Sequence, residues 1–282
     1  MEKERILELQ KIATDIRLGA LRAVYNAKSG HPGGALSSAD ILACLYFSEL
    51  NIDVNNPKWE DRDRFVLSKG HSCPGLYATL AEKGFFDKSE LDSFRHTGAL
   101  LQGHPDMKAI SGVDMSTGSL GQGFSCACGM ALGAKISGKS YRTYALVGDG
   151  ESQEGQVWEA IMFAAHYKLD NLCLIIDSNG LQIDGCVKDV MNVMPYEPKL
   201  EAFGWNVITI DGNNIEEILA ALEAARAVKG KPTAIIAKTT KGKGVSFMEN
   251  QASWHGKAPN EEQYNIAVSE LTEYKNQLGG NK

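Results

Sequence analysis

Residues 142–150 of the chain read RTYALVGDG, and residues 172–180 read LCLIIDSNG. Each segment is a short apolar run that ends in a polar, glycine-containing turn, which is the pattern of a buried strand followed by a loop. The residues between them, from 155 to 168, follow a helical pattern. A strand, a helix and a second strand in this order predict two parallel strands of one sheet.

The same alternation extends outward to both ends of the chain. Strands are predicted at 64–67, 142–147, 172–176, 207–210 and 233–237, and further helices at 4–28, 120–136, 214–228, 260–278 and from Ser37 or Ser38 to Phe47. A break rich in glycine and proline at 29–34 separates the first two helices. Continuous apolar strands between helices predict an α/β protein, a three-layer α/β/α fold with a mainly parallel sheet. No repeat or interior boundary is evident, so residues 1–282 are predicted to form one domain.

The composition excludes several classes of protein. Hydrophobic residues make up 43% and charged residues 23% of the 282 residues, which excludes a disordered or collagen-like chain. The net charge is −6 without a basic cluster, so no nucleic acid or anionic membrane is expected as a partner. No apolar run approaches the roughly 18 residues of a membrane span, and the first ten residues do not resemble a signal peptide. The six cysteines form no CxxC pair, which favours reduced thiols and a cytoplasmic location.

The polar, glycine-rich segments mostly follow the predicted strands. The carboxyl ends of parallel strands share one edge of the sheet, where ligands bind in open α/β folds. Asp149 and Asn179 follow neighbouring strands, and carboxylate and amide oxygens are ligands that Mg²⁺ or Ca²⁺ prefers. The helix that starts near Glu154 offers its free N–H groups to a phosphate. Asp-Gly and Asn-Gly are also common in ordinary turns, so both interpretations stand at this point.

Residues 133–140 read GAKISGKS, which satisfies the phosphate-binding pattern GxxxxGKS. That motif needs a strand before it and a helix after it, whereas here a helix precedes it and a strand follows. A phosphate would meet the helix C-terminus, whose dipole repels anions. We therefore predict an exposed helix-to-strand turn.

The GDG of residues 148–150, followed by Asn179, resembles the thiamine diphosphate motif, in which a GDG precedes a pair of asparagines by about 28 residues. Ser178 replaces the first asparagine of the pair, and the metal-binding second one is present. The resemblance implies that Asp149, Asn179 and the main-chain carbonyl of Leu181 hold a divalent metal. Mg²⁺ is expected, and Ca²⁺ or Mn²⁺ is possible.

Short strings that contain histidine narrow the family. Four strings resemble transketolase in the same order along the chain: Ser29-Gly-His31-Pro, Ser68-Lys-Gly-His71, Gly103-His104-Pro and Ser253-Trp-His255-Gly. Two more agree: Thr117-Gly-Ser-Leu-Gly-Gln-Gly123 and Gly150-Glu-Ser-Gln-Glu-Gly155. The resemblance covers residues 8–260. His96 and His166 match no string, and surface or packing roles are predicted for them.

The resemblance assigns a role to each matched residue. His31 and His255 are implied to exchange protons with the sugar, His104 to bind its terminal hydroxyl, and His71 to lie beside the diphosphate and the reacting carbon. The implied cofactor contacts are His71, Gly118, Ser119, Leu120, Gly150, Glu154, Asn179, Lys241 and His255. Glu154 also resembles the glutamate that links two active sites across the dimer, although an acidic residue at a helix N-terminus has a simpler explanation. Ser119 stands where most members have proline, and Lys241 could be an exposed basic turn instead.

Transketolases carry three domains, and this chain has length for the first only. The residues after His255 are too few for a second α/β domain. The pyrimidine-binding and C-terminal domains are therefore expected on a separate C-terminal subunit, with two copies of each chain in the assembly. The helix at 121–136, rich in glycine and alanine, fits a subunit interface and core packing equally.

The resemblance implies a transferase subunit that uses thiamine diphosphate and Mg²⁺. It would move a two-carbon ketol unit from a ketose phosphate of the xylulose 5-phosphate type to an aldose phosphate, as in the pentose phosphate pathway. A related enzyme for an unusual catabolic sugar stays open. So does the α subunit of a 2-oxo-acid dehydrogenase, although its decarboxylation does not call for this set of histidines. A non-catalytic protein is less favoured, since no matched histidine or metal ligand is lost.

Overall fold

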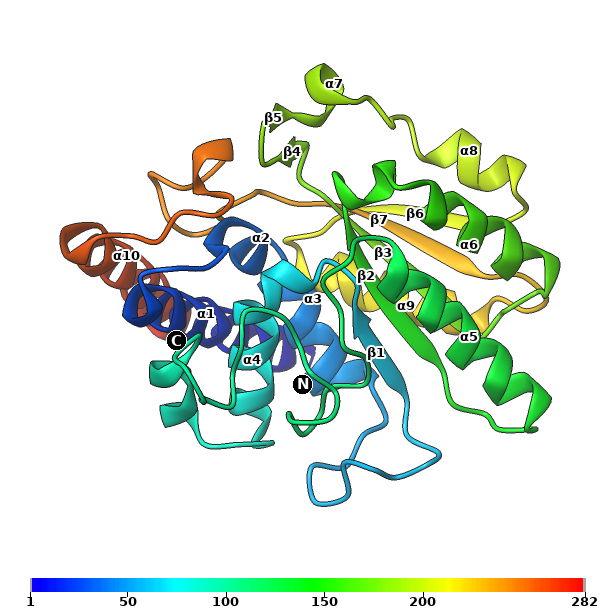
Figure 1. Cartoon of the computed structure of the whole chain (residues 1–282), viewed down its shortest axis with the longest axis horizontal. Helices are drawn as coiled ribbons and strands as arrows, with labels where there is room; N and C mark the ends of the chain where they lie inside the picture. Colours follow the sequence, from blue (N-terminus) through cyan, green and yellow to red (C-terminus); the bar gives the residue numbers. More distant parts are fainter. Residues whose placement is uncertain (1, 281–282) are drawn as a thin grey trace.

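A five-stranded parallel sheet forms the centre of the computed structural model, which describes residues 2–280 (Figure 1). Its strands are β1 (Arg64–Leu67), β2 (Thr143–Gly148), β3 (Leu172–Ser178), β6 (Asn206–Asp211) and β7 (Thr233–Lys238). The spatial order is β1-β2-β3-β7-β6, and all four strand pairings are parallel. The register places Gly148 beside Asp177 and Ser178 beside Lys238, so the polar turns after the strands meet at one edge. This confirms the predicted sheet.

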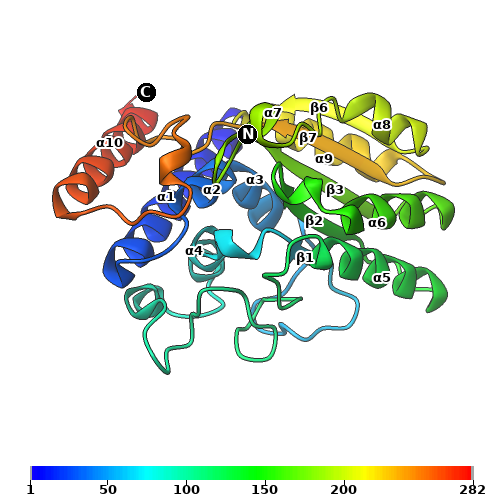
Figure 2. The same ribbon diagram turned by 45° about the horizontal axis from the view of Figure 1, so that its top comes forward.

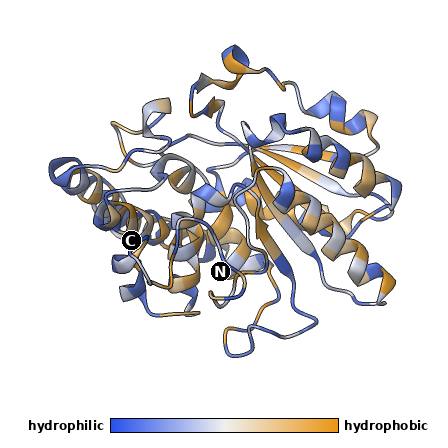
Figure 3. Ribbon diagram, in the orientation of Figure 1, coloured by the Kyte–Doolittle hydropathy of each residue, from blue (hydrophilic) through white to orange (hydrophobic). Residues whose placement is uncertain are grey.

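Helices cover both faces of the sheet. One face packs against α1 (Glu2–Ala27), α3 (Ala39–Cys44), α4 (Cys73–Lys83) and α9 (Ile215–Ala227), and the other against α5 (Gln122–Ile136), α6 (Gly155–His166) and α8 (Glu197–Ala202). Along β2, Tyr144 and Leu146 point into the first core, whereas Ala145 and Val147 point into the second. Figure 2 shows α5 and α6 side by side outside the sheet, and Figure 3 shows that apolar residues predominate in its strands. The three-layer α/β/α architecture is confirmed.

Local differences from the prediction concern the break after the first helix. Residues 32–34 do not separate two helices but begin α2 (Pro32–Ser37), with His31 at its N-cap. Proline is suited to the first turn because its fixed φ is helical and its missing N–H has no partner there. The helix predicted from Ser37 or Ser38 to Phe47 is present as α3, which continues into the π-helical turn η1 (Leu45–Glu49), and α2 precedes it.

The sequence predicted neither α4 nor α8. It also did not predict the 3₁₀ turns η2 (Gly70–Ser72), η3 (Lys88–Ser93), η4 (Glu151–Gln153) and η5 (Ala252–Trp254), the hairpin of β4 (Leu181–Gln182) and β5 (Gly185–Cys186), and α7 (Val187–Val190). The predicted tail helix is present as α10 (Glu261–Gly280), which packs along α1. Within residues 2–280, no helix is long and apolar enough to cross a membrane.

The GAKISGKS segment forms the predicted turn. The helix α5 ends at Ile136, and Gly138 takes a left-handed φ of 64° before the chain enters β2. Lys139 lies at the surface, where its ammonium pairs with Glu60 at 3.2 Å and Asp61 at 2.7 Å. A phosphate loop is therefore excluded here.

Candidate active site

A cavity of about 520 Å³ opens at the carboxyl edge of the sheet. It is lined by segments that follow β1, β2, β3 and β7, together with the start of α2, the β4–β5 hairpin and η5. Among the expected site residues, those that line it are His31, His71, His104, Gly118, Leu120, Asp149, Gly150, Glu154, Asn179, Leu181, Lys241 and His255. Ser119 is exposed and does not line the cavity. His96 and His166 are also exposed and lie outside it, as predicted.

Three histidines of the cavity lining form a cluster. The ring centroids of His31 and His71 are 5.1 Å apart, those of His71 and His255 5.1 Å, and those of His31 and His255 5.5 Å. Burial, followed by the charges of neighbouring groups, lowers the pKa of His31 to about 4, of His255 to about 3 and of His71 to about 2. All three rings are therefore neutral near pH 7, and each can accept a proton.

His104 stands at the exposed rim of the cavity. Its ring packs against Gly118, where an added Cβ would come within 2.9 Å of Cδ2 of His104, so only glycine leaves room for the ring. The guanidinium of Arg95 lies against Gly103 and donates to the hydroxyl of Ser29 at 2.6 Å. Burial, followed by the charge of Arg95, lowers the pKa of His104.

Hard oxygen atoms gather in the same cavity at the turns that follow β2 and β3. Asp149 is 3% exposed, and its carboxylate accepts from the Gly180 N–H at 2.5 Å and from the Tyr196 hydroxyl at 3.0 Å. Asn179 turns its amide oxygen toward the Leu181 N–H, 3.1 Å away, and donates from Nδ2 to Asp177 at 3.2 Å. Burial raises the pKa of Asp149 to about 6, a cost that an adjacent cation would offset.

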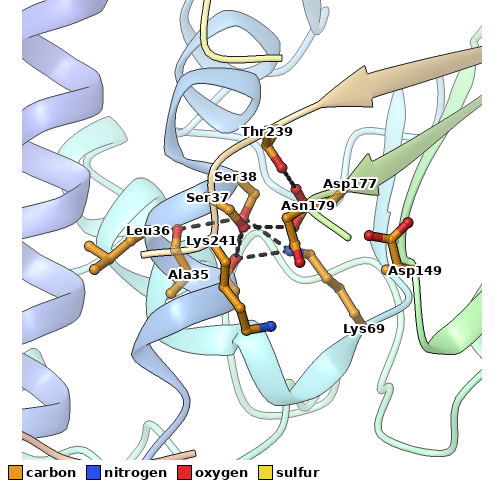
Figure 4. Close-up of polar contacts among 12 residues, drawn as sticks. Ala35, Leu36, Ser37, Ser38, Lys69, Asp149, Asp177, Asn179, Thr239 and Lys241 are labelled. Atoms are coloured by element: carbon orange, nitrogen blue, oxygen red, sulfur yellow. Dashed lines mark hydrogen bonds and ion pairs between the residues drawn. The ribbon is translucent and has the colours of Figure 1, made fainter. Parts of the chain in front are cut away.

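A buried ion pair between Lys69 and Asp177 connects the turn after β1 to the end of β3 (Figure 4). The ammonium of Lys69, from the turn after β1, donates to Asp177 at the end of β3 at 2.5 Å and to the Gly34 carbonyl at 2.9 Å. The Asp177 carboxylate also accepts from Ser37 at 2.7 Å and from Thr239. Burial alone would raise the pKa of Asp177, but Lys69 and these hydroxyls hold it below its ordinary value. One pair thus fixes β1, β3, β7 and α2 relative to one another.

Glu151 organises the turns on the far side of β2. Its buried carboxylate accepts from the N–H of Gly121 at 2.9 Å, the N–H of Gly148 at 3.1 Å and the hydroxyl of Ser68. Ser68 in turn accepts from the Phe124 N–H at 2.9 Å. The GDG turn, the turn after β1 and the start of α5 are therefore held together by one side chain.

Lys241 is a cavity residue and not an exposed basic turn. It is 2% exposed, and burial lowers its pKa to about 8. Its ammonium lies 3.4 Å from the Leu181 carbonyl, so a cation already stands beside one of the three expected metal ligands. Glu154 is exposed at the cavity rim and makes no side-chain cap to α6, which leaves its carboxylate available to a neighbouring subunit.

The polar lining fits a charged organic cofactor. Among the described residues, seven buried side-chain polar atoms have no hydrogen-bond partner. Three of them belong to cavity residues: Nδ1 of His31, Nδ1 of His255 and Oγ of Ser72. Buried polar atoms without a hydrogen-bond partner destabilise the fold unless a ligand satisfies them, so the cavity is suited to a polar ligand. Within residues 2–280, no group of three or more His, Cys, Asp or Glu side chains could hold a metal ion by itself.

Sequence reasoning missed Lys69, Asp177, Glu151 and Ser72. Lys69 and Asp177 lie inside the quoted strings SKGH and DSNG, but nothing local indicates that they pair. A charged residue directly after a continuous apolar strand was the available signal, because such a residue enters the buried edge of the sheet.

Comparisons with known proteins agree with this geometry. The family described as the transketolase thiamine diphosphate-binding domain matches residues 9–279. The chain is 47% identical to a 6-deoxy-6-sulfo-D-fructose transketolase subunit of Clostridium sp. strain MSTE9, over 95% of this chain and 98% of that protein. It is 44% identical to an apulose-4-phosphate transketolase subunit of Phocaeicola vulgatus, over 95% of this chain and 94% of that protein. Human transketolase is 45% identical over 91% of this chain but only 41% of its own length. The structure of Campylobacter jejuni transketolase superposes with a TM-score of 0.87 and 35% identity, over 96% of this chain and 45% of that one.

Proposed function

The chain belongs to the transketolase family, as the N-terminal subunit of a split transketolase, and we propose that it supplies the diphosphate half of a ketol-transferring site. One observation carries this proposal: a cluster of three histidines and a set of hard oxygen donors line a single cavity. The first set suits proton transfer on a sugar, and the second suits a metal-bound diphosphate.

Thiamine diphosphate, when bound, supplies the nucleophilic carbon that takes up the two-carbon unit. His31 and His255 each carry an unpartnered ring nitrogen, and burial keeps both rings neutral near pH 7, so either ring is free to accept a proton from a sugar hydroxyl and return it later. His71, whose ring centroid lies 5.1 Å from that of each, would lie beside the diphosphate and the reacting carbon. His104 at the rim donates to the terminal hydroxyl of the ketose.

Asp149, Asn179 and the Leu181 carbonyl are the proposed metal ligands. One carboxylate, one amide oxygen and one carbonyl form a small, hard donor set, which suits Mg²⁺ shared with diphosphate oxygens, and Ca²⁺ or Mn²⁺ as substitutes. Gly150 and Lys241 would face the diphosphate. Gly118 and Leu120 would lie along the middle of the cofactor, since both line the cavity.

The sugar is proposed to be a ketose with an anionic end. The relatives named above act, by their names, on 6-deoxy-6-sulfo-D-fructose and on apulose 4-phosphate. These names favour a specialised catabolic ketose at least as much as xylulose 5-phosphate. The anionic end would be bound by the C-terminal subunit, because the sugar-side wall of this chain is formed by histidines.

The assembly is proposed to contain two copies of this chain and two of a C-terminal subunit. On α5, Ala127 and Ala131 are buried in the core, whereas Gly129 and Gly133 face open space. The neighbouring apolar side chains of Ile136, Met162, Phe163 and Tyr167 are exposed. This face therefore suits a second copy of the chain, and the exposed Glu154 at the cavity rim suits contact across that interface.

A reconstitution assay tests the function. The chain is mixed with a C-terminal subunit, thiamine diphosphate and Mg²⁺, and supplied with ribose 5-phosphate as acceptor. Xylulose 5-phosphate, 6-deoxy-6-sulfofructose and apulose 4-phosphate serve in turn as donors. Ketol transfer is expected only in the mixture. Activity of this chain alone would refute the need for a partner, and inactivity of a cofactor-loaded complex with every donor would contradict ketol transfer.

Replacement of His104 by alanine is expected to lower kcat about tenfold to a hundredfold while the affinity for thiamine diphosphate stays within about twofold. The reason is that His104 lies at the rim, and a hydrogen bond to a polar substrate contributes about 1–3 kcal/mol. Steady-state kinetics and cofactor titration measure the two effects, with His96→Ala as the control. Equal losses in turnover and in cofactor affinity would contradict the substrate role.

A further inference from the structure

Ser72 has an unusual setting at the start of α4. It is the N-cap residue of this helix, a position where a serine hydroxyl normally accepts a backbone N–H of the first turn. Here the side chain makes no such bond. The residue is 1% exposed and lines the cavity, and its Oγ has no hydrogen-bond partner. The hydroxyl therefore does not stabilise the unliganded fold through a hydrogen bond.

The main-chain carbonyl of Gly34, a residue that packs against Ser72, is already occupied. The Gly34 carbonyl accepts from Lys69 at 2.9 Å, from Ser38 at 2.8 Å and from Ser37 at 3.1 Å. Three donors already use the lone pairs of this oxygen, so the Ser72 hydroxyl cannot donate a hydrogen bond to it. The Ser72 hydroxyl is therefore available to donate a hydrogen bond to a ligand in the cavity.

Two adjacent glycines of α2 make room for side chains that arrive from other segments. A Cβ at Gly34 would lie 2.5 Å from Oγ of Ser72, and a Cβ at Gly33 would lie 3.2 Å from Cγ and Cε of Lys241. The hydroxyl of Ser72 and the ammonium stem of Lys241 therefore rest on neighbouring residues of one short helix.

Two buried ammonium groups, those of Lys69 and Lys241, stand near this corner, and the carboxylates of Asp177 and Asp149 act on that of Lys241. Lys69 is neutralised by Asp177, but Lys241 has no carboxylate within salt-bridge distance among the residues that the structure describes. The N-terminus of α4, an 11-residue helix, adds the positive end of its dipole. A buried ammonium, a helix N-terminus and a free hydroxyl together form a subsite for an anion.

We propose that Ser72 donates a hydrogen bond to the diphosphate of thiamine diphosphate. The bond would form beside Lys241, where Gly33 and Gly34 leave room for both side chains. This inference rests on the proposed function, because it assigns a further binding residue to the same cavity. The unpartnered hydroxyl destabilises the fold while the cavity holds no anion. It contributes favourably to the binding free energy when a phosphate oxygen accepts its hydrogen bond.

The first test is the variant Ser72→Ala, measured in the complex with the C-terminal subunit in the presence of Mg²⁺. Isothermal titration with thiamine diphosphate is expected to give an affinity at least about tenfold weaker, as for the loss of a hydrogen bond to a charged group. Thermal unfolding of the unliganded chain is expected to show an unchanged or higher Tm, because the variant removes an unsatisfied buried hydroxyl. The control Ser93→Ala removes a hydroxyl that donates to the Glu90 carbonyl outside the cavity, so it should leave the cofactor affinity unchanged and should not raise the Tm.

A second variant moves the hydroxyl to the facing helix. Gly34→Ser alone should weaken cofactor binding, since its Cβ would lie 2.5 Å from the Ser72 oxygen. The double variant Ser72→Ala/Gly34→Ser relieves that overlap and should regain most of the affinity. A double variant that binds no better than Ser72→Ala would count against a role for the hydroxyl itself.

The outcomes separate this inference from the function on which it rests. If the unmodified complex does not bind thiamine diphosphate, the proposed function fails. If that complex binds it and Ser72→Ala binds it equally well, only the inference fails. A variant that loses affinity and also lowers the Tm of the unliganded chain would assign Ser72 a structural role and overturn the proposal.

Discussion

Replacement of Asp149 by alanine is expected to abolish the metal-dependent retention of thiamine diphosphate. Asp149 is the one carboxylate among the three proposed metal ligands, and the other two are neutral oxygens of Asn179 and Leu181. Removal of groups that merely orient a metal ligand costs about 10- to 100-fold in affinity, so loss of the charged ligand should cost more than about 100-fold.

The measurement is equilibrium dialysis of thiamine diphosphate at several Mg²⁺ concentrations. The affinity of the unmodified complex should rise with Mg²⁺, and that of Asp149→Ala should stay low at every concentration. Asp184→Ala is the matched control, because Asp184 is exposed on the β4–β5 hairpin near the same cavity. Asp149→Asn keeps the shape of the side chain and should fail like alanine. Retention equal to that of the unmodified complex in both Asp149 variants would remove Asp149 from the metal site.

The fold could be predicted because its strands are apolar on both faces. Residues 144–147 are all apolar and have buried side chains on alternating sides, so a covered parallel sheet is the expected structure. The start of α2 could not be predicted in this way. Its Pro32, Gly33 and Gly34 are typical of a break, whereas in the fold Gly33 packs against Lys241 and Gly34 against Ser72.

The site was predicted only as far as its parts are local. The GDG turn and the histidine strings carry their identity within a few residues. The pairs that hold these strings together are remote: Lys69 and Asp177 are 108 residues apart, and Ser37 and Asp177 are 140 apart. One sequence contains no signal for such a pairing. The unpartnered Ser72 hydroxyl is a property of the folded state alone, since it follows from what Gly34 and its neighbours already bind.

Replacement of Lys69 by methionine is expected to lower the free energy of unfolding by about 3–5 kcal/mol, because it leaves the fully buried Asp177 carboxylate without its counter-ion. The loss is a large part of the roughly 5–15 kcal/mol that stabilises an ordinary domain. Cofactor affinity should also fall, since Asp177 orients the amide of Asn179 and Lys69 holds the Gly34 carbonyl of α2. Chemical unfolding of the unliganded chain measures the first effect, and cofactor titration the second.

Two further variants show whether the isolated charge causes the loss. Lys139→Met makes the same chemical change in the exposed pairs with Glu60 and Asp61, and should cost much less stability than Lys69→Met. Lys69→Met/Asp177→Asn removes both buried charges and should recover much of the stability lost in the single variant, because no carboxylate then stays unpaired. It should not recover cofactor affinity, since α2 would still lack its lysine anchor. If the double variant were as unstable as Lys69→Met, the loss would arise from the missing hydrogen bonds to Gly34 and Ser38 and not from the charge of Asp177.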